Sequence, residues 1–358
     1  MFSVAAADAA DGDCESVLSQ FDSNDSVLLP ATLDTVGALS TTILISIHVA
    51  RNLSIFRNKR DYVTEKIEKI HSETQHLREF LLRETRLLCL VLNRPGELGA
   101  QYRAAILDTW GPRCHRLLFF VGTRNASTLF DEKRAYHEQR LSEHVSLVTL
   151  LDVVDMHDNV WHKLRAMLEY VVQRTALMST FQWIVIVDDD AYVVVENLLL
   201  FVRNRPHSEP AYFGVIGRLW GGYVSTSAAL LMSVHNYRRF MREALAHSKC
   251  PTGQHRTHAA DVTLGRCLAE VGLQPGDSRG ASGRHRFHHV PIEAVIQKHD
   301  GLPAWLSKFI RFGDRMPADF NCCADDLIGV HYLSPAQIRT LEMYIYNVHP
   351  FSDRDVWR

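Results

Sequence analysis

The chain has 358 residues, of which 46% are hydrophobic and 22% charged, as in globular proteins large enough to bury a sizeable core. Its formal net charge of −2 argues against nucleic acid as the main partner. None of the seven cysteines forms a CxxC pair, which argues against a zinc ribbon.

The N-terminal part divides into segments of different composition. Residues 1–35 carry seven acidic residues and no lysine or arginine, and we expect them to be disordered. Residues 36–50 are largely apolar but short for a membrane span, which needs about 20 residues. Basic residues follow this stretch rather than precede it, the reverse of what the positive-inside rule requires of a luminal enzyme. A signal-anchor and a buried or disordered stretch therefore remain equal alternatives.

Residues 51–85 are polar with a thin apolar stripe, so we expect a helical stem or a plain solvated helix. The compact domain is predicted to span residues 86–350. The predicted strands are residues 87–92, 116–122, 145–151 and 183–187, and the predicted helices are residues 98–110 and 161–173. Strands that alternate with helices predict an α/β fold with a mainly parallel sheet covered on both faces. Such sheets bind ligands at the carboxyl ends of their strands.

Three carboxylates, Asp188, Asp189 and Asp190, directly follow the apolar strand predicted at 183–187. Adjacent carboxylates repel one another, so a bound cation would offset their cost. Hard oxygen ligands suit Mg²⁺ or Mn²⁺, which also bind substrate phosphates. Alternate side chains of an extended segment share a face, so Asp188 and Asp190 are predicted to converge. An acidic strand-to-loop turn without a ligand is the alternative.

The segment WIVIVDDDAYVVVENL, residues 183–198, resembles the DxD segment of the inverting β-1,3-glycosyltransferases that include Fringe and core 1 β-1,3-galactosyltransferase. Other segments similar to this family occur in the family's order: LLCLVLNRP, DTWGPRC, AYFG, DVTLGRC, GDSRG, CC and HYLS. GDSR, LGRC and the adjacent pair Cys322 and Cys323 look most like the core 1 branch.

The resemblance implies a GT-A type fold, with a Rossmann-like, mainly parallel sheet flanked by helices. It also implies an Mn²⁺ site in which Asp190 and His331 are the main protein ligands, with Asp188 as a further ligand. Neutral imidazole with carboxylate is a suitable ligand set for Mn²⁺. Without the resemblance, the lone His331 would be interpreted as a hydrogen-bonded core histidine.

The donor expected from the resemblance is UDP-galactose. Asp188 and Asp189 would lie beside its nucleotide and sugar, and Trp110 and Arg279 complete the expected donor-binding residues. Inverting transfer needs one base to take the proton of the acceptor hydroxyl. The resemblance assigns this role to Asp261, which as a helix N-cap would have a purely structural alternative role.

Asp277 is the second candidate for the base.

Three departures from the family pattern affect the expected site. Ala260 replaces a glutamate. Residues 226–229, Thr-Ser-Ala-Ala, replace Gly-Gly-Ala-Gly, and their Cβ atoms are expected to narrow the pocket. His162 replaces a lysine, whose charge Lys163 or Arg165 would supply instead.

The resemblance predicts transfer of galactose to the 3-hydroxyl of O-linked N-acetylgalactosamine (GalNAc) on glycoprotein acceptors. It further implies a type II Golgi membrane protein with a luminal catalytic domain, and a homodimer. Fringe-like transfer of N-acetylglucosamine is an alternative that keeps the fold and the chemistry. A degenerate, chaperone-like member without catalysis is the other alternative, although such a chaperone lacks the acidic triplet.

Six cysteines lie in the part predicted to fold, and three N-x-S/T sequons occur, a combination that favours a secretory compartment. From their places beside predicted elements, Cys89 is expected to pair with Cys114, and Cys250 with Cys267, although six cysteines allow 15 connectivities. A late group of histidines (His285, His288, His289 and His299) is expected to lie in a solvated loop.

Overall fold

The computed structural model describes residues 69, 72, 75–77, 79–123, 136–217, 222–247, 250–251, 259–280, 282–297 and 322–348. The segments 1–35 and 36–50, most of the predicted stem, the three sequons and His299 lie outside these residues. Residues 79–84 are helical. Among the described residues, we find no helix with the length and apolar character that crossing a membrane requires.

A mixed eight-stranded sheet forms the centre of the domain, with the order β11-β7-β10-β5-β1-β2-β4-β3 in the described part of the chain. Its strands are β1 (Leu87–Leu92), β2 (Arg116–Thr123), β3 (Tyr136–Arg140), β4 (Val145–Val154), β5 (Trp183–Asp188), β7 (Ala211–Phe213), β10 (Leu230–Ser233) and β11 (Gln274–Pro275). The four predicted strands became β1, β2, β4 and β5, which pair in parallel. The predicted mainly parallel α/β sheet is therefore confirmed.

The sequence prediction missed the strands that flank this parallel centre. β10 runs antiparallel to β5 and β7, and β3 runs antiparallel to β4. Two smaller sheets complete the domain: β12 (Phe287–His288), β13 (Gly329–Val330) and β6 (Tyr192–Val193) form one, and β8 (Val215–Gly217) and β9 (Tyr223–Ser225) form the other. Most of these strands have two to four residues, too few for a readable periodicity.

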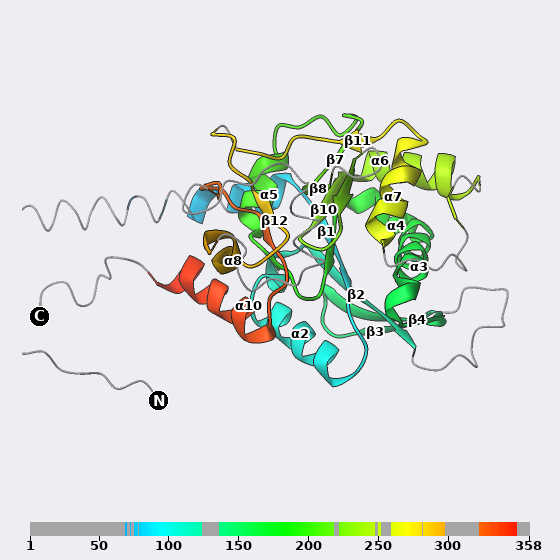
Figure 1. The fold of residues 1–358 in the computed structure, drawn as a ribbon, viewed down its shortest axis with the longest axis horizontal. Coiled ribbons are helices and arrows are strands. Elements are labelled where there is room, and N and C mark those ends of the chain that lie inside the picture. The colour runs from blue at the N-terminus through cyan, green and yellow to red at the C-terminus, as the bar shows by residue number, and fades with distance from the viewer. Residues whose placement is uncertain are drawn as a thin grey trace, which may run out of the picture. The chain divides into compact units, whose positions relative to one another are not determined.

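Helices cover both faces of the sheet (Figure 1). One face carries α2 (Gly96–Asp108), α5 (Val195–Val202) and α10 (Pro335–Glu342), and the other carries α3 (Val160–Val172), α4 (Thr175–Thr180), α6 (Val234–Phe240) and α7 (Ala260–Ala269). Shorter elements are η2 (Gly111–Arg113), η4 (His157–Asn159), η6 (Met241–Leu245), α8 (Ile292–Ile296) and η8 (Met343–Asn347). The predicted helices 98–110 and 161–173 correspond to α2 and α3.

Strand β1 shows why the sheet needs both helical layers. All six of its residues are buried, because alternate side chains enter opposite cores. Leu88 and Leu90 pack with α3 and α7, whereas Leu87 and Val91 pack with α2 and α5. A strand buried on both faces has a continuous apolar sequence rather than an alternating one.

Strand pairing brings distant segments to the carboxyl end of β5. Leu92, the last residue of β1, is in register with Asp188, the last residue of β5. The short strand β6 follows the acidic triplet and pairs antiparallel with β13, which leads directly to His331. The amide of Leu333 donates to the carbonyl of Asp190 at 3.0 Å and holds the two segments together.

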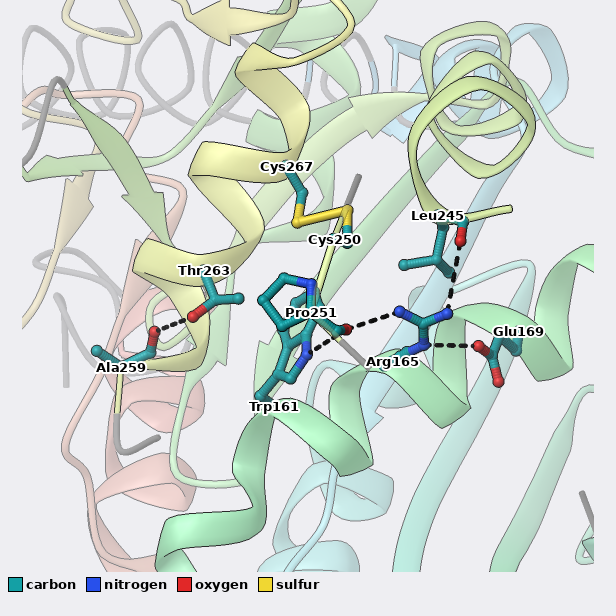
Figure 2. Close-up of a disulfide and its surroundings, with 9 residues drawn as sticks. All are labelled: Trp161, Arg165, Glu169, Leu245, Cys250, Pro251, Ala259, Thr263 and Cys267. Atoms are coloured by element: carbon teal, nitrogen blue, oxygen red, sulfur yellow. Dashed lines mark hydrogen bonds and ion pairs between the residues drawn. A yellow bond between two sulfur atoms is a disulfide. The ribbon is translucent and has the colours of Figure 1, made fainter. Parts of the chain in front are cut away.

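Both predicted disulfides are present. Cys89 and Cys114 join β1 to the chain after α2, with 6.1 Å between their Cα atoms. Cys250 and Cys267 join the segment after η6 to helix α7, with 5.4 Å between theirs (Figure 2). A third disulfide links Cys322 to its neighbour Cys323.

Candidate active site

A cavity of about 750 Å³ opens at the carboxyl ends of the parallel strands. Its walls come from the residues after β1, the start of α3, the acidic triplet, the turn after β9, the first turn of α7 and the residues around His331. The titratable side chains in these walls include Arg94, Asp155, Lys163, Asp188, Asp190, Asp261 and His331. This is where a doubly covered α/β sheet binds its ligand.

Asp188, Asp190 and His331 converge in this cavity. Each offers one ligand atom, and these atoms lie within 4.8 Å of one another. The Nε2 atom of His331 is 3.0 Å from Oδ1 of Asp190. The structure thus brings together the three residues that the resemblance named as metal ligands, across a long separation in sequence.

The tautomer of His331 follows from its second nitrogen. Nδ1 lies 3.0 Å from the carbonyl oxygen of His289, which can only accept, so Nδ1 carries a proton. In the neutral ring, Nε2 therefore presents a lone pair to the buried Oδ1 of Asp190, which has no other hydrogen-bond partner among the described residues. Two acceptors at this distance need a proton or a cation between them. A carboxylate–imidazole set oriented by a backbone carbonyl fits Mn²⁺.

The surroundings shift the pKa values of the two carboxylates in this cluster in opposite directions. Burial, with the charges of Asp190 and Asp189, raises the pKa of Asp188 to about 6. Burial would also raise the pKa of Asp190, but His331 and Arg94 outweigh it and lower that pKa to about 2. Asp188 is therefore the member of the cluster that most lacks a compensating positive charge.

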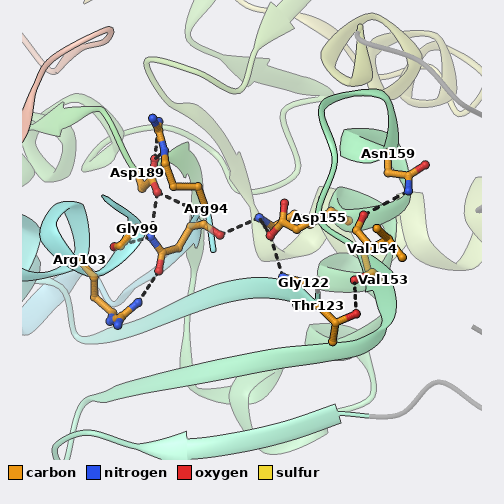
Figure 3. Close-up of polar contacts among 12 residues, drawn as sticks. Arg94, Gly99, Arg103, Gly122, Thr123, Val153, Val154, Asp155, Asn159 and Asp189 are labelled. Carbon is orange, nitrogen blue, oxygen red and sulfur yellow. Dashed lines mark hydrogen bonds and ion pairs between the residues drawn. The ribbon is translucent and has the colours of Figure 1, made fainter. Parts of the chain in front are cut away.

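Asp189 points towards Arg94 (Figure 3). Its carboxylate accepts from the Arg94 amide at 2.7 Å, from Arg94 Nε at 2.8 Å and from the Asn93 side chain at 2.8 Å. Only 1% of the residue is exposed. Both oxygens thus tie the end of β1 to the end of β5. Because Asp189 also lines the cavity, its contact with the donor stays a prediction.

Arg94 is a wall residue that the sequence interpretation missed. Its guanidinium lies 2.7 Å from Asp189 and 2.9 Å from Asp190, and it stacks over the ring of Tyr102 at 4.3 Å. It fixes the orientation of Asp190 while its side chain stays about one-third exposed in the cavity. The signal was present, because Arg94 follows a buried parallel strand at the ligand-binding edge of the sheet.

Lys163 supplies the buried positive charge near the start of α3. Its Nζ donates to the Asn93 carbonyl and to Oδ2 of Asp155, both at 2.7 Å. Lys163 lines the cavity. Arg165 does not, because its guanidinium is bound to Glu169 and to the Pro251 carbonyl (Figure 2). His162, at the position where the family pattern has lysine, is not among the lining residues. Lys163 therefore supplies the positive charge in the cavity wall that the family pattern places at position 162.

Asp261 lies in the same cavity, in the first turn of α7. The helix begins at Ala260 and its N-cap position is Ala259, so the interpretation of Asp261 as the N-cap is wrong. Its Oδ1 accepts from the Val262 amide at 2.9 Å. Burial raises its pKa. A carboxylate with a raised pKa in a cavity is a better proton acceptor than an exposed one.

Trp110 and Arg279 do not line the cavity, and their predicted contact with the donor is not supported. Trp110 is fully buried, and its Nε1 donates to the Ala191 carbonyl at 3.1 Å, so it supports the turn after the triplet from inside the core. Arg279 forms an ion pair with Asp277 at 2.8 Å. Asp277 also lies outside the wall, and its hydrogen bond from Arg279 lowers its pKa to about 2, which makes it a poor second candidate for the base.

The late histidines were expected in a solvated loop, and for His288 and His289 this is wrong. His288 in β12 is fully buried, with Nε2 3.1 Å from the His285 carbonyl. His289 lines the cavity and orients His331 through its carbonyl. The pairing of β12 with β13 draws this segment into the interior, which no local pattern announces.

Comparison with known proteins agrees with this geometry. The sequence model of the family described as Fringe-like matches residues 104–218, which include the acidic triplet. The chain is 26% identical over 281 residues to "Glycoprotein-N-acetylgalactosamine 3-beta-galactosyltransferase 1" of Xenopus laevis, covering 77% of this chain and 70% of the frog protein. The chain is therefore similar to the Fringe-like family over the segment that contains the acidic triplet.

A second relative of this chain is "Beta-1,3-galactosyltransferase 6" of Mus musculus. The two are 28% identical over 225 residues, covering 52% of this chain and 61% of the mouse protein. Both relatives carry the name of a β-galactosyltransferase. The chain therefore has the α/β, GT-A type fold that the sequence predicted, and its relatives are named as transferases.

Proposed function

We propose that this protein transfers galactose, with inversion, from UDP-galactose to the 3-hydroxyl of O-linked N-acetylgalactosamine on glycoproteins. The name of the frog relative, which shares most of the chain, supports this donor and acceptor. The observation that carries the proposal is a single cavity that holds a carboxylate–imidazole cluster and, apart from it, the carboxylate of Asp261.

Asp188, Asp190 and His331 would hold Mn²⁺. When bound, the cation would supply positive charge to the diphosphate that leaves from the donor sugar. The chain's own residues prepare this site, since Arg94 fixes Asp190 and the His289 carbonyl fixes the His331 tautomer.

Asp261 would act as the base. The oxygen of the acceptor hydroxyl attacks the anomeric carbon, the bond from that carbon to the diphosphate oxygen breaks, and the hydroxyl proton passes to the Asp261 carboxylate. Among the carboxylates of the described cavity wall, Asp155 and Asp189 are ion-paired, and Asp188 and Asp190 belong to the cluster. Asp261 is then the one left to accept a proton.

The proposed location is the secretory pathway, as a type II Golgi membrane protein anchored by residues 36–50. The three disulfides support an oxidising compartment. A homodimer is part of the same proposal, and sedimentation of the full chain in mild detergent would measure it.

Turnover of the full chain on a GalNAc-bearing peptide tests the proposal. With Mn²⁺ and UDP-galactose we expect a β-1,3-linked galactose, identified by NMR, and we expect excess chelator to abolish it. UDP-N-acetylglucosamine in place of UDP-galactose tests the Fringe-like alternative. Binding of UDP-galactose and Mn²⁺ without transfer to any acceptor would favour a chaperone-like protein, and full activity in excess chelator would contradict the metal assignment.

A further inference from the structure

A second cavity, of about 630 Å³, opens at the amino end of β5, whereas the acidic triplet follows the carboxyl end of the same strand. Its walls come from the end of α4, the residues just before β5, His207 and one side of α6 and η6. Three of its lining residues are arginines, Arg238, Arg239 and Arg242, and none of the described residues in its wall is acidic. We call this cavity the arginine groove.

Hydrogen bonds to the backbone fix the shape of the arginine groove. The Val234 amide, at the start of α6, donates to the Gln182 carbonyl at 2.8 Å. The hydroxyl of Ser233, the N-cap of α6, donates to the His207 carbonyl at 2.6 Å. Oε1 of Gln182 accepts from the Arg86 amide at 2.6 Å, which orients the side-chain amide and leaves its Nε2 as a donor in the wall. The groove is therefore formed before any ligand binds.

The positive charge of the arginine groove is only partly compensated. Glu243 pairs with Arg239 at 3.2 Å and with Arg242 at 2.7 Å, and it does not line the groove. The guanidinium of Arg238 is exposed and has no ion-pair partner among the described residues. Three arginines and one glutamate leave an excess of two positive charges, in a chain whose formal net charge is −2. This local excess attracts anionic ligands.

The arrangement of the arginines favours an extended acidic peptide over a compact anion. Arg238 and Arg242 are four residues apart on one helical stretch, so they lie on the same side of it, about 6 Å apart along its axis. Alternate side chains of an extended peptide also share a side, with a spacing of about 6.6 Å. Two carboxylates at alternate positions therefore match two guanidinium groups, which bind carboxylates through paired N–H donors. Met178, Phe181 and Val234 add an apolar lining for a neighbouring side chain.

Helix α3 runs between the catalytic cavity and the arginine groove. Val160, the first residue of α3, lines the cavity, and α4, the next helix, contributes Met178 and Ser179 to the groove. Both helices lie on the same face of the sheet (Figure 1). The 13 residues of α3 span about 20 Å, a distance that about six residues of extended peptide cover.

We propose that the arginine groove binds an acidic stretch of the acceptor polypeptide, about six or more residues away from the residue that carries the acceptor sugar. This inference rests on the proposed function, in which the acceptor is a glycoprotein. The sugar would occupy the catalytic cavity, and the polypeptide would extend along α3 to the groove. The groove would then select among glycoproteins by their charge, without taking part in the chemistry.

Binding of a labelled peptide to the full chain tests the groove without requiring turnover. The probe alternates glutamate with leucine, and a second probe with glutamine in place of glutamate is its control. Fluorescence anisotropy should show binding of the acidic probe alone, with an affinity that falls as salt is added. Replacing both arginines, Arg238→Gln with Arg242→Gln, should weaken binding about tenfold, since each exposed ion pair contributes roughly threefold. Arg83→Gln, at an exposed ion pair outside the groove, is the matched control and should bind as wild type.

Turnover tests whether the ligand of the groove is the acceptor. Two GalNAc-bearing peptides carry either glutamates or glutamines about six to eight residues from the glycosylated residue. With the wild type, we expect the glutamate peptide to have a KM about tenfold lower. In the double arginine variant the two KM values should converge, and kcat should stay at the wild-type level, because neither arginine lines the catalytic cavity.

Several results would overturn the inference. Equal binding of the two probes, or an unchanged dissociation constant in the double variant, would show that the groove does not bind acidic peptide. Displacement of the probe by an equal concentration of inorganic phosphate would assign the groove to a small anion. Equal wild-type KM values for the two glycopeptides would exclude the acceptor as the ligand. If the wild type transfers no galactose to either glycopeptide, the proposed function fails, and competition of both glycopeptides with the labelled probe still decides what the groove binds.

Discussion

Nε2 of His331 lies 3.0 Å from Oδ1 of Asp190, two atoms that the antiparallel pairing of β13 with β6 brings together. The ring of His331 makes an edge-to-face contact with the ring of His289, and the His289 carbonyl fixes the tautomer of His331. Backbone contacts, from the β13–β6 pairing and from the His289 carbonyl, therefore hold the imidazole in the cluster. This rigidity suits a site whose ligands must hold their geometry before the cation arrives.

The affinity for Mn²⁺ is expected to fall as the pH drops through about 6. Burial and two neighbouring carboxylates raise the pKa of Asp188 to about 6, and a ligand carboxyl must lose its proton to bind. Below that pH, affinity should fall about tenfold per unit. His331 acts in the same direction, since Asp190 outweighs burial and raises its pKa. Titrations at pH 5, 6 and 7.5 measure this.

The same shift has a consequence for stability. A carboxyl whose pKa is higher in the folded state favours folding when protonated, so its contribution is lost as the pH rises through about 6. In chelator, the melting temperature should therefore decline from pH 5 to 7.5 at this site, and Mn²⁺ should reverse the decline. Asp188→Asn is the control, because it should flatten the chelator profile. An unchanged profile in that variant would assign the effect to other groups.

Asp261→Asn should lower turnover by about 10²–10⁴-fold, the usual contribution of a general base. The amide keeps an oxygen to accept from the Val262 amide, so the variant should fold and bind Mn²⁺ normally. Single-turnover kinetics with saturating donor measure the loss. Turnover above about a third of wild type falls outside the range for a lost base and would transfer the role to another group.

Replacing both Cys250 and Cys267 by alanine should destabilise the domain by about 3 kcal/mol. The bridge joins two residues 17 positions apart in sequence, and closing a loop of about 15 residues in the unfolded chain is worth about 3 kcal/mol. The Pro251 carbonyl accepts from Trp161 and Arg165 at 3.1 and 2.7 Å, so we expect the segment to stay docked on α3 (Figure 2). Urea unfolding measures the difference. In reductant, the gap between variant and wild type should shrink, and an equal gap under both conditions would contradict a role of the disulfide.

Two opposing effects determine how Gly265→Ala, in the middle of α7, changes the stability of the domain. Alanine in a helix interior gains about 1 kcal/mol over glycine. Here, however, the new Cβ would lie 2.6 Å from Cβ of Tyr223 and 3.2 Å from its Cα, and overpacking costs about 1–3 kcal/mol. We expect a net loss of stability and a lower kcat, because the helix that carries Asp261 must shift.

Gly280→Ala is the matched control for this prediction. Its Cβ would lie 3.4 Å from Cβ of Ala324, an ordinary contact, so stability should change by less than about 0.5 kcal/mol. Chemical unfolding of both variants gives the comparison. If Gly265→Ala proves more stable than the wild type, the close packing of α7 on β9 is not limiting.

The sequence by itself determined the parallel centre of the sheet, the acidic triplet at its ligand edge and two of the three disulfides, which lie beside predicted elements. These follow from local patterns, since a buried strand needs a run of apolar residues and parallel strands bind ligands at one edge. The resemblance added Asp261 and His331, which no local pattern singles out.

Only the tertiary structure decided which way each polar side chain turns. Asp189 and Trp110 sit in or beside motifs that suggest ligand contact, yet one holds Arg94 and the other fills the core. Ser227 entered as a departure from a pattern and lines the same cavity as Asp188. These outcomes depend on partners that are distant in sequence, so burial and hydrogen bonding across strands, which local propensity does not encode, determine them.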